Sequence, residues 1–189
     1  MNILIVGCGT VGGGVARILL DLKEELSFRA AQEINLYKIL EPFPEKSIER
    51  FSLPAELFCG NGKKLSSNEI NNYLNELLNS NEIDLIVETV GGTDDFVYNL
   101  ALKTIEKKKF YVTANKALLA EKGKEIFQKS EDNKIFIGYE AAVCGAIPVI
   151  KTITENFTGD QIQSISGIFN GTSNYILSSM HDSNLSFHE

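Results

Sequence analysis

A glycine-rich turn that directly follows a short apolar segment is the feature that most constrains the fold of this chain. Residues 2–6 read NILIV and residues 7–12 read GCGTVG, before apolar residues recur at helical spacing. An apolar run without polar alternation is typical of a strand buried on both faces, as in a parallel sheet. A GxGxxG turn between such a strand and a helix predicts a backbone that approaches a pyrophosphate, with the N–H groups of the helix beyond it. The alternative is a glycine turn without a ligand.

Strand-like and helix-like patterns alternate through the following 130 or so residues. Further strands are expected at 34–40, 84–88, 110–113 and 134–139, and helices at 67–78, 94–107 and 116–129, after one long first helix. This alternation predicts an α/β fold with a doubly wound parallel sheet. Together with the glycine turn it predicts a Rossmann-like NAD(P)-binding domain over residues 1–145.

The pattern changes after Pro148. Residues 161–169 alternate polar and apolar side chains, which predicts a strand with one covered face. We expect residues 146–189 to begin an α+β domain for dimerisation and catalysis, cut short because 183–189 form no closing element. Its apolar face, including Ile162, Ile165 and Phe169, is expected to lack cover and to favour association.

Composition excludes several classes of protein. Hydrophobic residues make up 43% and charged residues 23% of the 189 residues, so a core can form without disulfides or metals. Three cysteines form no paired framework and fit a reducing compartment. The net charge of -7 argues against a nucleic-acid surface, and no apolar run reaches the roughly 20 residues of a membrane span. We expect a soluble, cytoplasmic protein that binds neither nucleic acid nor membrane.

The dinucleotide fingerprint also requires an acid after the second strand, to bind the ribose hydroxyls. Glu41 holds that place, and a carboxylate there favours NAD because it repels a 2′-phosphate. Lys46 and Arg50, just downstream, can receive that phosphate instead. Glu41 can also be a solvated loop acid, so the choice between NAD and NADP stays open.

Two further strand ends carry candidate ligand-binding residues, because the carboxyl ends of strands line the ligand crevice of such a sheet. Thr89, Val90 and Gly91 follow one expected strand, and their backbone is expected close to the nicotinamide or ribose. An ordinary glycine turn is the alternative. Lys116 follows the next strand, where it can pair with phosphate or carboxylate or be a surface lysine.

The segment 139–148 (YEAAVCGAIP) places Glu140 before small residues that form no amphipathic pattern. Carbonyl groups beside a carboxylate suit a hard cation. Cys144 can instead be a nucleophile of aldehyde dehydrogenation, or a small packing residue. Further on, a turn at Asn170-Gly171 precedes Thr172 and Ser173, which are placed to cap a helix; its N–H groups can hold a small anionic or zwitterionic substrate.

In this order the segments resemble homoserine dehydrogenase closely. The matching segments are VGCGTVGGGVARIL, IVETVGG, VTANKALLA, YEAAVCGAIPVI and SGIFNGTSNYIL, which span residues 5–177. The resemblance implies an NAD(P)-dependent oxidoreductase of amino-acid biosynthesis, on the route to threonine and methionine. It would interconvert L-homoserine and L-aspartate 4-semialdehyde as a homodimer.

The resemblance also assigns roles to individual residues. For the cofactor it implies that Thr10 and Val11 touch the pyrophosphate, that Thr89 and Val90 lie near the ribose and nicotinamide, and that Lys116 reaches the cofactor and the substrate side. The other expected cofactor-binding residues come from the glycine motif and the strand ends: Gly7, Gly9, Gly12, Glu41 and Gly91. Those implied for the substrate are Asn170, Gly171 and Thr172. Those implied for a monovalent cation such as Na⁺, mostly through backbone carbonyls, are Glu140, Val143, Gly145 and Ile147.

For the dehydrogenase that the resemblance implies, Lys116 is the catalytic candidate, because the aspartate and lysine that perform catalysis in this family lie in a later segment than Glu189. Reduction of the aldehyde requires a proton at the developing alkoxide, and Lys116 alone is not assigned that task. We therefore expect this chain to bind cofactor with little turnover. The alternatives are a noncatalytic NAD(P)-binding module and an aldehyde dehydrogenase that depends on Cys144.

Overall fold

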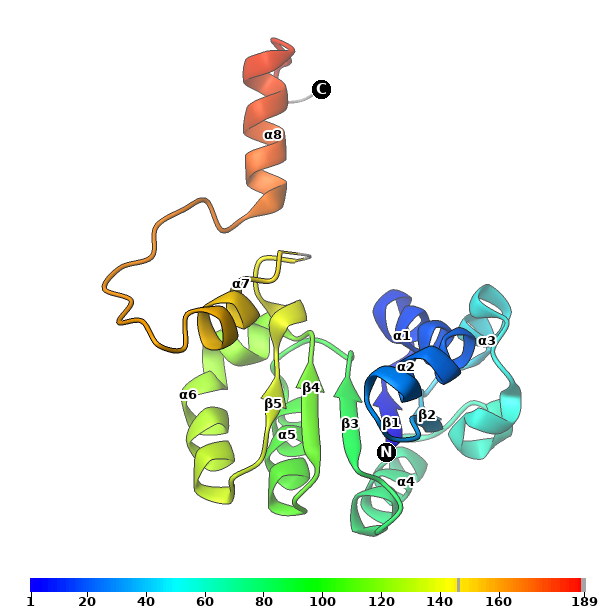
Figure 1. Ribbon diagram of the computed structural model, residues 1–189. Coiled ribbons are helices and arrows are strands. Elements are labelled where there is room, and N and C mark those ends of the chain that lie inside the picture. Colours follow the sequence, from blue (N-terminus) through cyan, green and yellow to red (C-terminus); the bar gives the residue numbers. More distant parts are fainter. Residues whose placement is uncertain (146, 188–189) are drawn as a thin grey trace. The chain divides into compact units, whose positions relative to one another are not determined.

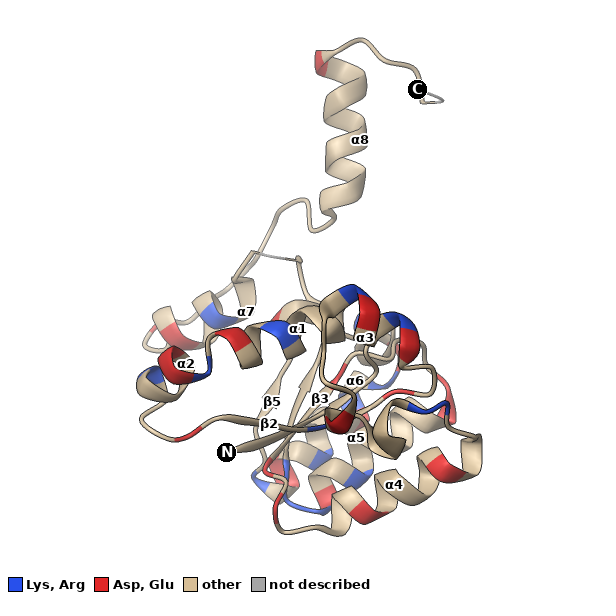
Figure 2. Ribbon diagram, turned by 90° about the vertical axis from the view of Figure 1, so that its right-hand side faces the viewer, with Lys and Arg blue, Asp and Glu red and all other residues tan. Residues whose placement is uncertain are grey.

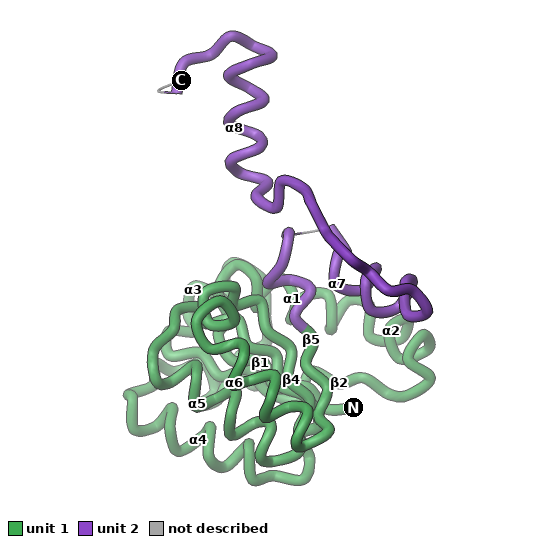
Figure 3. The backbone as a smooth tube through the Cα atoms, turned by 90° about the vertical axis from the view of Figure 1, so that its left-hand side faces the viewer, with its two compact units in different colours: residues 1–138 green, residues 139–189 purple. Residues whose placement is uncertain are grey.

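The computed structural model describes residues 1–145 and 147–187. They form two compact units, Met1–Gly138 and Tyr139–Glu189, coloured separately in Figure 3. Each unit is described by itself. The domain boundary expected between residues 145 and 146 stays a prediction.

A five-stranded parallel sheet forms the centre of the first unit (Figure 1). Its strand order is β2-β1-β3-β4-β5. The strands are β1 (Asn2–Val6), β2 (Asn35–Leu40), β3 (Leu85–Glu88), β4 (Phe110–Thr113) and β5 (Ile137–Gly138). This confirms the predicted α/β, Rossmann-like fold.

The expectation of a strand over 134–139 is wrong for its first residues, and the strand begins only at Ile137. The residues just before it form the end of the preceding helix (Lys116–Asn133). Lys134 is the C-cap of that helix in the left-handed conformation (φ 55°), and the N–H of Ile135 donates to the carbonyl of Ser130. A backbone bonded into a helix end cannot also form a sheet ladder, so pairing with β4 is confined to Ile137 and Gly138.

Helices cover both faces of the sheet (Figure 2). They are α1 (Thr10–Asp21), α2 (Lys23–Arg29), α3 (Glu45–Phe51), α4 (Ser67–Asn79), α5 (Asp95–Glu106) and α6 (Lys116–Asn133). Across the sheet, β2 lies on one side of β1, and β3, β4 and β5 follow one another on the other side. The connection from β1 to β2 therefore runs in the opposite direction to the connections from β2 to β3, β4 and β5. Right-handed crossovers therefore place α1 on one face and α4, α5 and α6 on the opposite face.

The core explains why the strands are apolar throughout. Leu4, Ile5 and Ile86 have no exposed surface, since each strand is covered on both sides. On the α1 face, Ile5 packs in one cluster with Ala16, and Phe58 joins it from the segment after α3. That segment contains the short 3-10 helices η1 (Ala55–Leu57) and η2 (Cys59–Gly62).

Two local expectations about the first unit need correction. The long first helix is divided at Leu22, which has φ -112° and ψ 22° and therefore ends α1 before α2 begins. The helix α3 was not among the expected helices: Pro42 and Pro44 cannot continue a strand or a helix, and they gave no sign that a helix begins at Glu45. Across residues 1–145 and 147–187, the helices all lack the length or the apolar character needed to span a bilayer.

The second unit consists of short helical turns and one longer helix. They are η3 (Glu140–Ala142), α7 (Val149–Lys151), the π-helical turn η4 (Thr152–Asn156) and α8 (Gly171–Asp182). In Figure 2, α8 carries no Lys or Arg, and its acidic residue is at its C-terminal end. Asn170 caps α8 by accepting from the N–H of Ser173 at 2.8 Å, so the expected cap by Thr172 or Ser173 is wrong.

The predicted strand at 161–169 is absent: these residues are irregular and exposed. Alternation of polar and apolar residues favours a strand only where a neighbouring strand pairs with its N–H and C=O groups, and the described part of this unit contains no other strand. Ile162, Ile165 and Phe169 of this segment are 43%, 56% and 54% exposed.

Candidate functional site

The carboxyl ends of four strands meet at one edge of the sheet in the first unit. The segments that leave them are the glycine turn after β1, Glu41 after β2, the turn 89–92 after β3, and Lys116 at the start of α6 after β4. The sheet therefore brings together all cofactor-binding candidates that were expected from the sequence. The candidates for the substrate and for a cation lie in the second unit.

At two positions of the turn, the fold of the protein requires glycine whether or not a ligand binds. Gly7 has φ 88°, and its N–H donates to the carbonyl of Leu40 at 2.9 Å. A Cβ on Gly12 would lie 2.5 Å from Thr89 Oγ1 and still closer to the carbonyl oxygen of Gly7. Glycine at these two positions therefore permits the turn and its close packing against the β3 end.

Gly9 differs from these two, because neither its backbone conformation nor the surrounding atoms exclude a larger residue at this position. A Cβ there would meet no atom within 4 Å, and its backbone is extended with φ -72° and ψ -152°. Gly9 is the N-cap of α1, which has neither a capping side chain nor an acid in its first turn. The first N–H groups of α1 are therefore left for an anion, and the backbone beside them is open to its approach.

Glu41 is bonded into the glycine turn and is not a freely solvated acid. Its carboxylate accepts from the N–H of Cys8 at 2.7 Å and from the N–H of Phe43 at 3.1 Å. The second strand end thus holds the first turn in place. Burial raises the pKa of the Cys8 thiol to about 11, so this side chain is a protonated packing group at neutral pH.

The helix α3 adds two contacts to the same turn. The Ser47 hydroxyl donates to the carbonyl of Cys8 at 2.5 Å, and Arg50 Nη1 donates to Thr10 Oγ1 at 3.0 Å. Arg50 therefore places a guanidinium at the rim of the turn. Sequence reasoning named Arg50 as a phosphate candidate but missed Ser47, because nothing in the sequence indicated that α3 folds back onto this turn.

The turn after β3 packs directly against the glycine turn. The Thr89 hydroxyl donates to the carbonyl of Gly7 at 2.7 Å. Gly91 and Gly92 have φ 82° and 80°, and Val90 is 45% exposed beside them. Glu88, which precedes this turn, is fully buried, and sequence reasoning missed it. An acid at the end of an otherwise apolar strand was the available signal.

Lys116 is the first residue of α6 and is exposed. The preceding Asn115 caps the helix by accepting from the N–H of Leu118 at 3.1 Å, and its Nδ2 donates to the carbonyl of Gly92 at 2.7 Å. The start of α6 is thereby tied to the turn after β3. The ammonium group of Lys116 extends from this fixed point at the carboxyl edge of the sheet.

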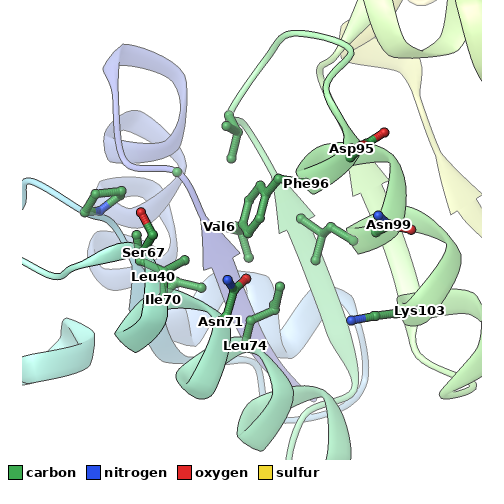
Figure 4. Close-up of a pocket in the computed structure, with 14 residues that line it drawn as sticks. Val6, Leu40, Ser67, Ile70, Asn71, Leu74, Asp95, Phe96, Asn99 and Lys103 are labelled. Atoms are coloured by element: carbon green, nitrogen blue, oxygen red, sulfur yellow. The ribbon is translucent and has the colours of Figure 1, made fainter.

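A cavity of about 500 Å³ opens between α4 and α5 and reaches the glycine turn at Gly7 (Figure 4). Figure 4 shows Ile70, Asn71 and Leu74 of α4 on one side, Phe96, Asn99 and Lys103 of α5 on the other, and Val6 and Leu40 at the strand ends. A mainly apolar cavity with a few polar groups at its walls suits a flat heterocycle. This cavity was not expected from the sequence.

In the second unit, Glu140 performs a helix-capping role. Its carboxylate accepts from the N–H groups of Ile150 at 3.0 Å and Lys151 at 2.8 Å. Gly145 has φ 61°, and Ile147 is 66% exposed. Among the described residues there is no cluster of three or more His, Cys, Asp and Glu side chains. A cation held here would depend on backbone carbonyl oxygens, including that of Val143.

The other candidates of the second unit have simple environments. Asn170, Gly171 and Thr172 form the exposed start of α8. Cys144 is half-buried with φ 55°. A nucleophilic Cys144 would need a base, and the sequence contains two histidines. His181 is hydrogen-bonded to Asp182, and His188 lies outside the described residues.

Comparison with known proteins identifies the family. Residues 7–140 match the family model of the homoserine dehydrogenase NAD binding domain, and residues 148–189 match the model of homoserine dehydrogenase. The chain is 40% identical over 187 residues to the homoserine dehydrogenase of Neisseria gonorrhoeae and, over the same number, to that of Helicobacter pylori. Each alignment covers 99% of this chain and 40% of the relative, so the chain spans about 40% of the length of these relatives.

Solved structures agree. A homoserine dehydrogenase from Thiobacillus denitrificans matches with a TM-score of 0.81 and 34% identity, covering 100% of this chain and 40% of that one. A putative homoserine dehydrogenase from Archaeoglobus fulgidus matches with a TM-score of 0.77 and 28% identity, covering 100% and 57%. Because the family model of the NAD binding domain matches residues 7–140, more than half of the chain, the chain belongs to the homoserine dehydrogenase family.

Proposed function

We propose that this chain forms the dinucleotide-binding domain (residues 1–145) and the beginning of the dimerisation and substrate domain (146–189) of a homoserine dehydrogenase. The reaction is L-homoserine + NAD(P)⁺ = L-aspartate 4-semialdehyde + NAD(P)H + H⁺. The observation that carries the proposal is the open, uncapped start of α1 behind Gly9, at the carboxyl edge of a parallel sheet.

The chain's own residues fit a nicotinamide dinucleotide. The N–H groups at the start of α1, with Thr10 and Val11, would hold the pyrophosphate, and Arg50 would add a positive charge at Thr10. The cavity beside Gly7 would take the adenine, because it is apolar and opens at the same turn. Val90 would border the nicotinamide end.

When bound, the dinucleotide supplies or accepts the hydride of the reaction. The residues of this chain bind and orient around it. Lys116 would hold a positive charge at the crevice, in contact with the cofactor and with the substrate side of the site. Asn170, Gly171 and Thr172 would border the substrate through the exposed start of α8.

We also propose a monovalent-cation site at Glu140, Val143, Gly145 and Ile147, a homodimer formed through the second domain, and a cytoplasmic location. Because the Glu140 carboxylate caps α7, the cation would be held mainly by backbone carbonyl groups, which suit a hard ion. A sodium-dependent rise in the melting temperature, compared with choline at equal ionic strength, tests this site. Equal melting temperatures in the two salts would remove it.

The experiment that tests cofactor binding is calorimetric titration of the folded chain with NADH and with NADPH. We expect saturable binding of one or both, and competition by ADP, which carries the adenine and the pyrophosphate without the nicotinamide. The ratio of the two affinities decides between Glu41 and Arg50 as the group that sets cofactor preference. Absence of heat with both dinucleotides, from a sample with native circular dichroism, would disprove the proposal.

A further inference from the structure

Glu88 is an acid with no exposed surface, at the end of β3. Its Oε1 accepts from the N–H groups of Val90 at 2.7 Å and Gly91 at 3.1 Å. Its Oε2 accepts from the hydroxyl of Thr113 at 2.6 Å and that of Tyr111 at 3.3 Å. Within residues 1–145 and 147–187, no ion pair includes Glu88, so its carboxylate is satisfied by four neutral donors.

These donors belong to two different segments of the chain. Val90 and Gly91 form the turn after β3, whereas Tyr111 and Thr113 belong to β4. Burial, with the nearby Glu88 carboxylate, raises the pKa of the Tyr111 hydroxyl above its usual range, so it keeps its proton and donates. One buried carboxylate therefore joins the end of β3, the turn that follows it, and the neighbouring strand.

Asn115 closes the network into a ring. Its N–H donates to Thr113 Oγ1 at 2.9 Å, and its side-chain amide donates to the carbonyl of Gly92 at 2.7 Å. The path from Glu88 through Thr113 and Asn115 to Gly92 therefore returns to the turn that Glu88 itself holds. The same Asn115 caps α6 just before Lys116. The ring therefore fixes both the turn after β3 and the start of α6, which lie side by side at the carboxyl edge of the sheet.

A buried carboxylate is a costly way to stabilise a fold, because an apolar residue of similar size often performs as well. What an acid provides here is four acceptor positions in one place, each meeting a donor. The glycines at 91 and 92, both at positive φ, would otherwise leave the turn free to change conformation. Holding that turn is a geometric task that an apolar side chain cannot perform.

We propose that Glu88 is a positioning residue that holds the Val90–Gly92 turn and the start of α6 in place, so that the nicotinamide end of the dinucleotide site is preformed. This inference rests on the proposed dinucleotide-binding function. It predicts that disrupting the ring weakens binding of the nicotinamide half far more than binding of the adenine half. Glu88 makes no hydrogen bond to the glycine turn or to α3, and of its four donors only Val90 also lines the cavity beside Gly7.

The test compares NADH with ADP on the wild-type chain and on Glu88→Gln. Glutamine has the same shape, but its amide nitrogen would face hydroxyl groups that now donate, so at least one buried donor loses its acceptor. We expect the dissociation constant of NADH to rise about tenfold and that of ADP to change less than twofold. Weakening of both ligands by the same factor, or of neither, would overturn the inference.

A second pair of variants decides the question if Glu88→Gln does not fold. Thr113→Val removes one donor to Glu88 and should weaken NADH but not ADP, whereas Thr113→Ser keeps the hydroxyl and should bind both normally. Thr104→Val is the matched control, because Thr104 is fully buried in α5 and its hydroxyl has no partner. Equal NADH affinities in Thr113→Val and Thr104→Val would refute the proposed role.

Failure of the proposed function itself would look different. In that case the wild-type chain binds neither NADH nor ADP, and the inference falls with it. Selective loss of NADH binding in Glu88→Gln and Thr113→Val, with normal ADP binding, supports both the proposed dinucleotide-binding function and the positioning role of Glu88.

Discussion

Gly9 and Gly12 belong to the same turn, yet the structure gives them opposite reasons to be glycine. At Gly12, an added Cβ would meet the backbone of Gly7 and the Thr89 hydroxyl. At Gly9, an added Cβ would meet nothing, and the extended backbone suits any residue. Alanine at these two positions should therefore separate the needs of folding from the needs of binding.

The magnitudes follow from these surroundings. Overpacking against backbone atoms, which cannot move aside cheaply, is expected to cost about 1–3 kcal/mol in Gly12→Ala and to lower the melting temperature by several degrees, roughly 3–10 °C. Gly9→Ala should cost less than about 1 kcal/mol, since the methyl group touches no other group and the only loss is that alanine is a poorer N-cap than glycine. If the methyl group keeps the pyrophosphate from one backbone N–H, it removes a charge-assisted hydrogen bond of about 1.5–3 kcal/mol, which is roughly a 10- to 100-fold loss of affinity.

The assay combines thermal unfolding with NADH and NADPH titration. Gly14→Ala serves as the control, because a Cβ there also meets nothing within 4 Å and lies further along α1. We expect weak binding with nearly normal stability in Gly9→Ala. In Gly14→Ala we expect normal binding and a stability that is unchanged or raised by up to about 1 kcal/mol, because Gly14 lies inside α1. Full affinity in a folded Gly9→Ala protein would refute the assignment of this backbone to the pyrophosphate.

Three further predictions concern the cavity, the buried thiols and the second unit. Asn99→Trp should fill the cavity and weaken ADP binding at unchanged melting temperature. Asn75→Trp, on α4 but outside the cavity lining, should leave ADP binding unchanged. Equal affinities of the two variants for ADP would place the adenine elsewhere. Burial raises the pKa of both Cys8 and Cys59 to about 11 from 9.0, so the unfolded chain loses these protons first and the free energy of unfolding should fall between pH 9 and 11, by up to about 1.4 kcal/mol per pH unit for each thiol. Denaturant titrations of the wild-type chain and of the double alanine variant would measure this, and an identical slope in both would contradict it. Ile165→Asp should reduce self-association in sedimentation velocity without changing NADH binding, and an unchanged sedimentation profile would show that this apolar surface is not the one that associates.

Much of the fold was predictable because its signals are local. The strands β1, β3 and β4 are short apolar runs closed by polar or glycine residues, and such runs are stable only when covered on both faces. The cap of α5 at Asp94 and the capping box of Ser66 and Glu69 at α4 likewise depend on residues close in sequence.

The failures occurred where pairing or packing at a distance competes with local pattern. Residues 161–169 alternate as a strand does, but alternation provides no partner for the backbone, and these residues are irregular. Lys134 was expected in a strand, but α6 extends through Asn133 and uses Lys134 as its left-handed cap. A period of two or of 3.6 residues says which faces are apolar and does not say what will cover them.

In the candidate site, too, some features follow from local sequence and others depend on the packing of distant segments. The sequence by itself determined that a glycine turn, an acid and a lysine follow the first, second and fourth strands, because the order of these residues is written in the chain. Only the tertiary structure decided that Glu41 holds the N–H of Cys8, that Arg50 reaches Thr10, and that Glu88 joins two turns in a buried ring. Hydrogen bonds between residues 25 to 40 positions apart depend on which strands become neighbours, and that choice is made by the packing of the whole sheet.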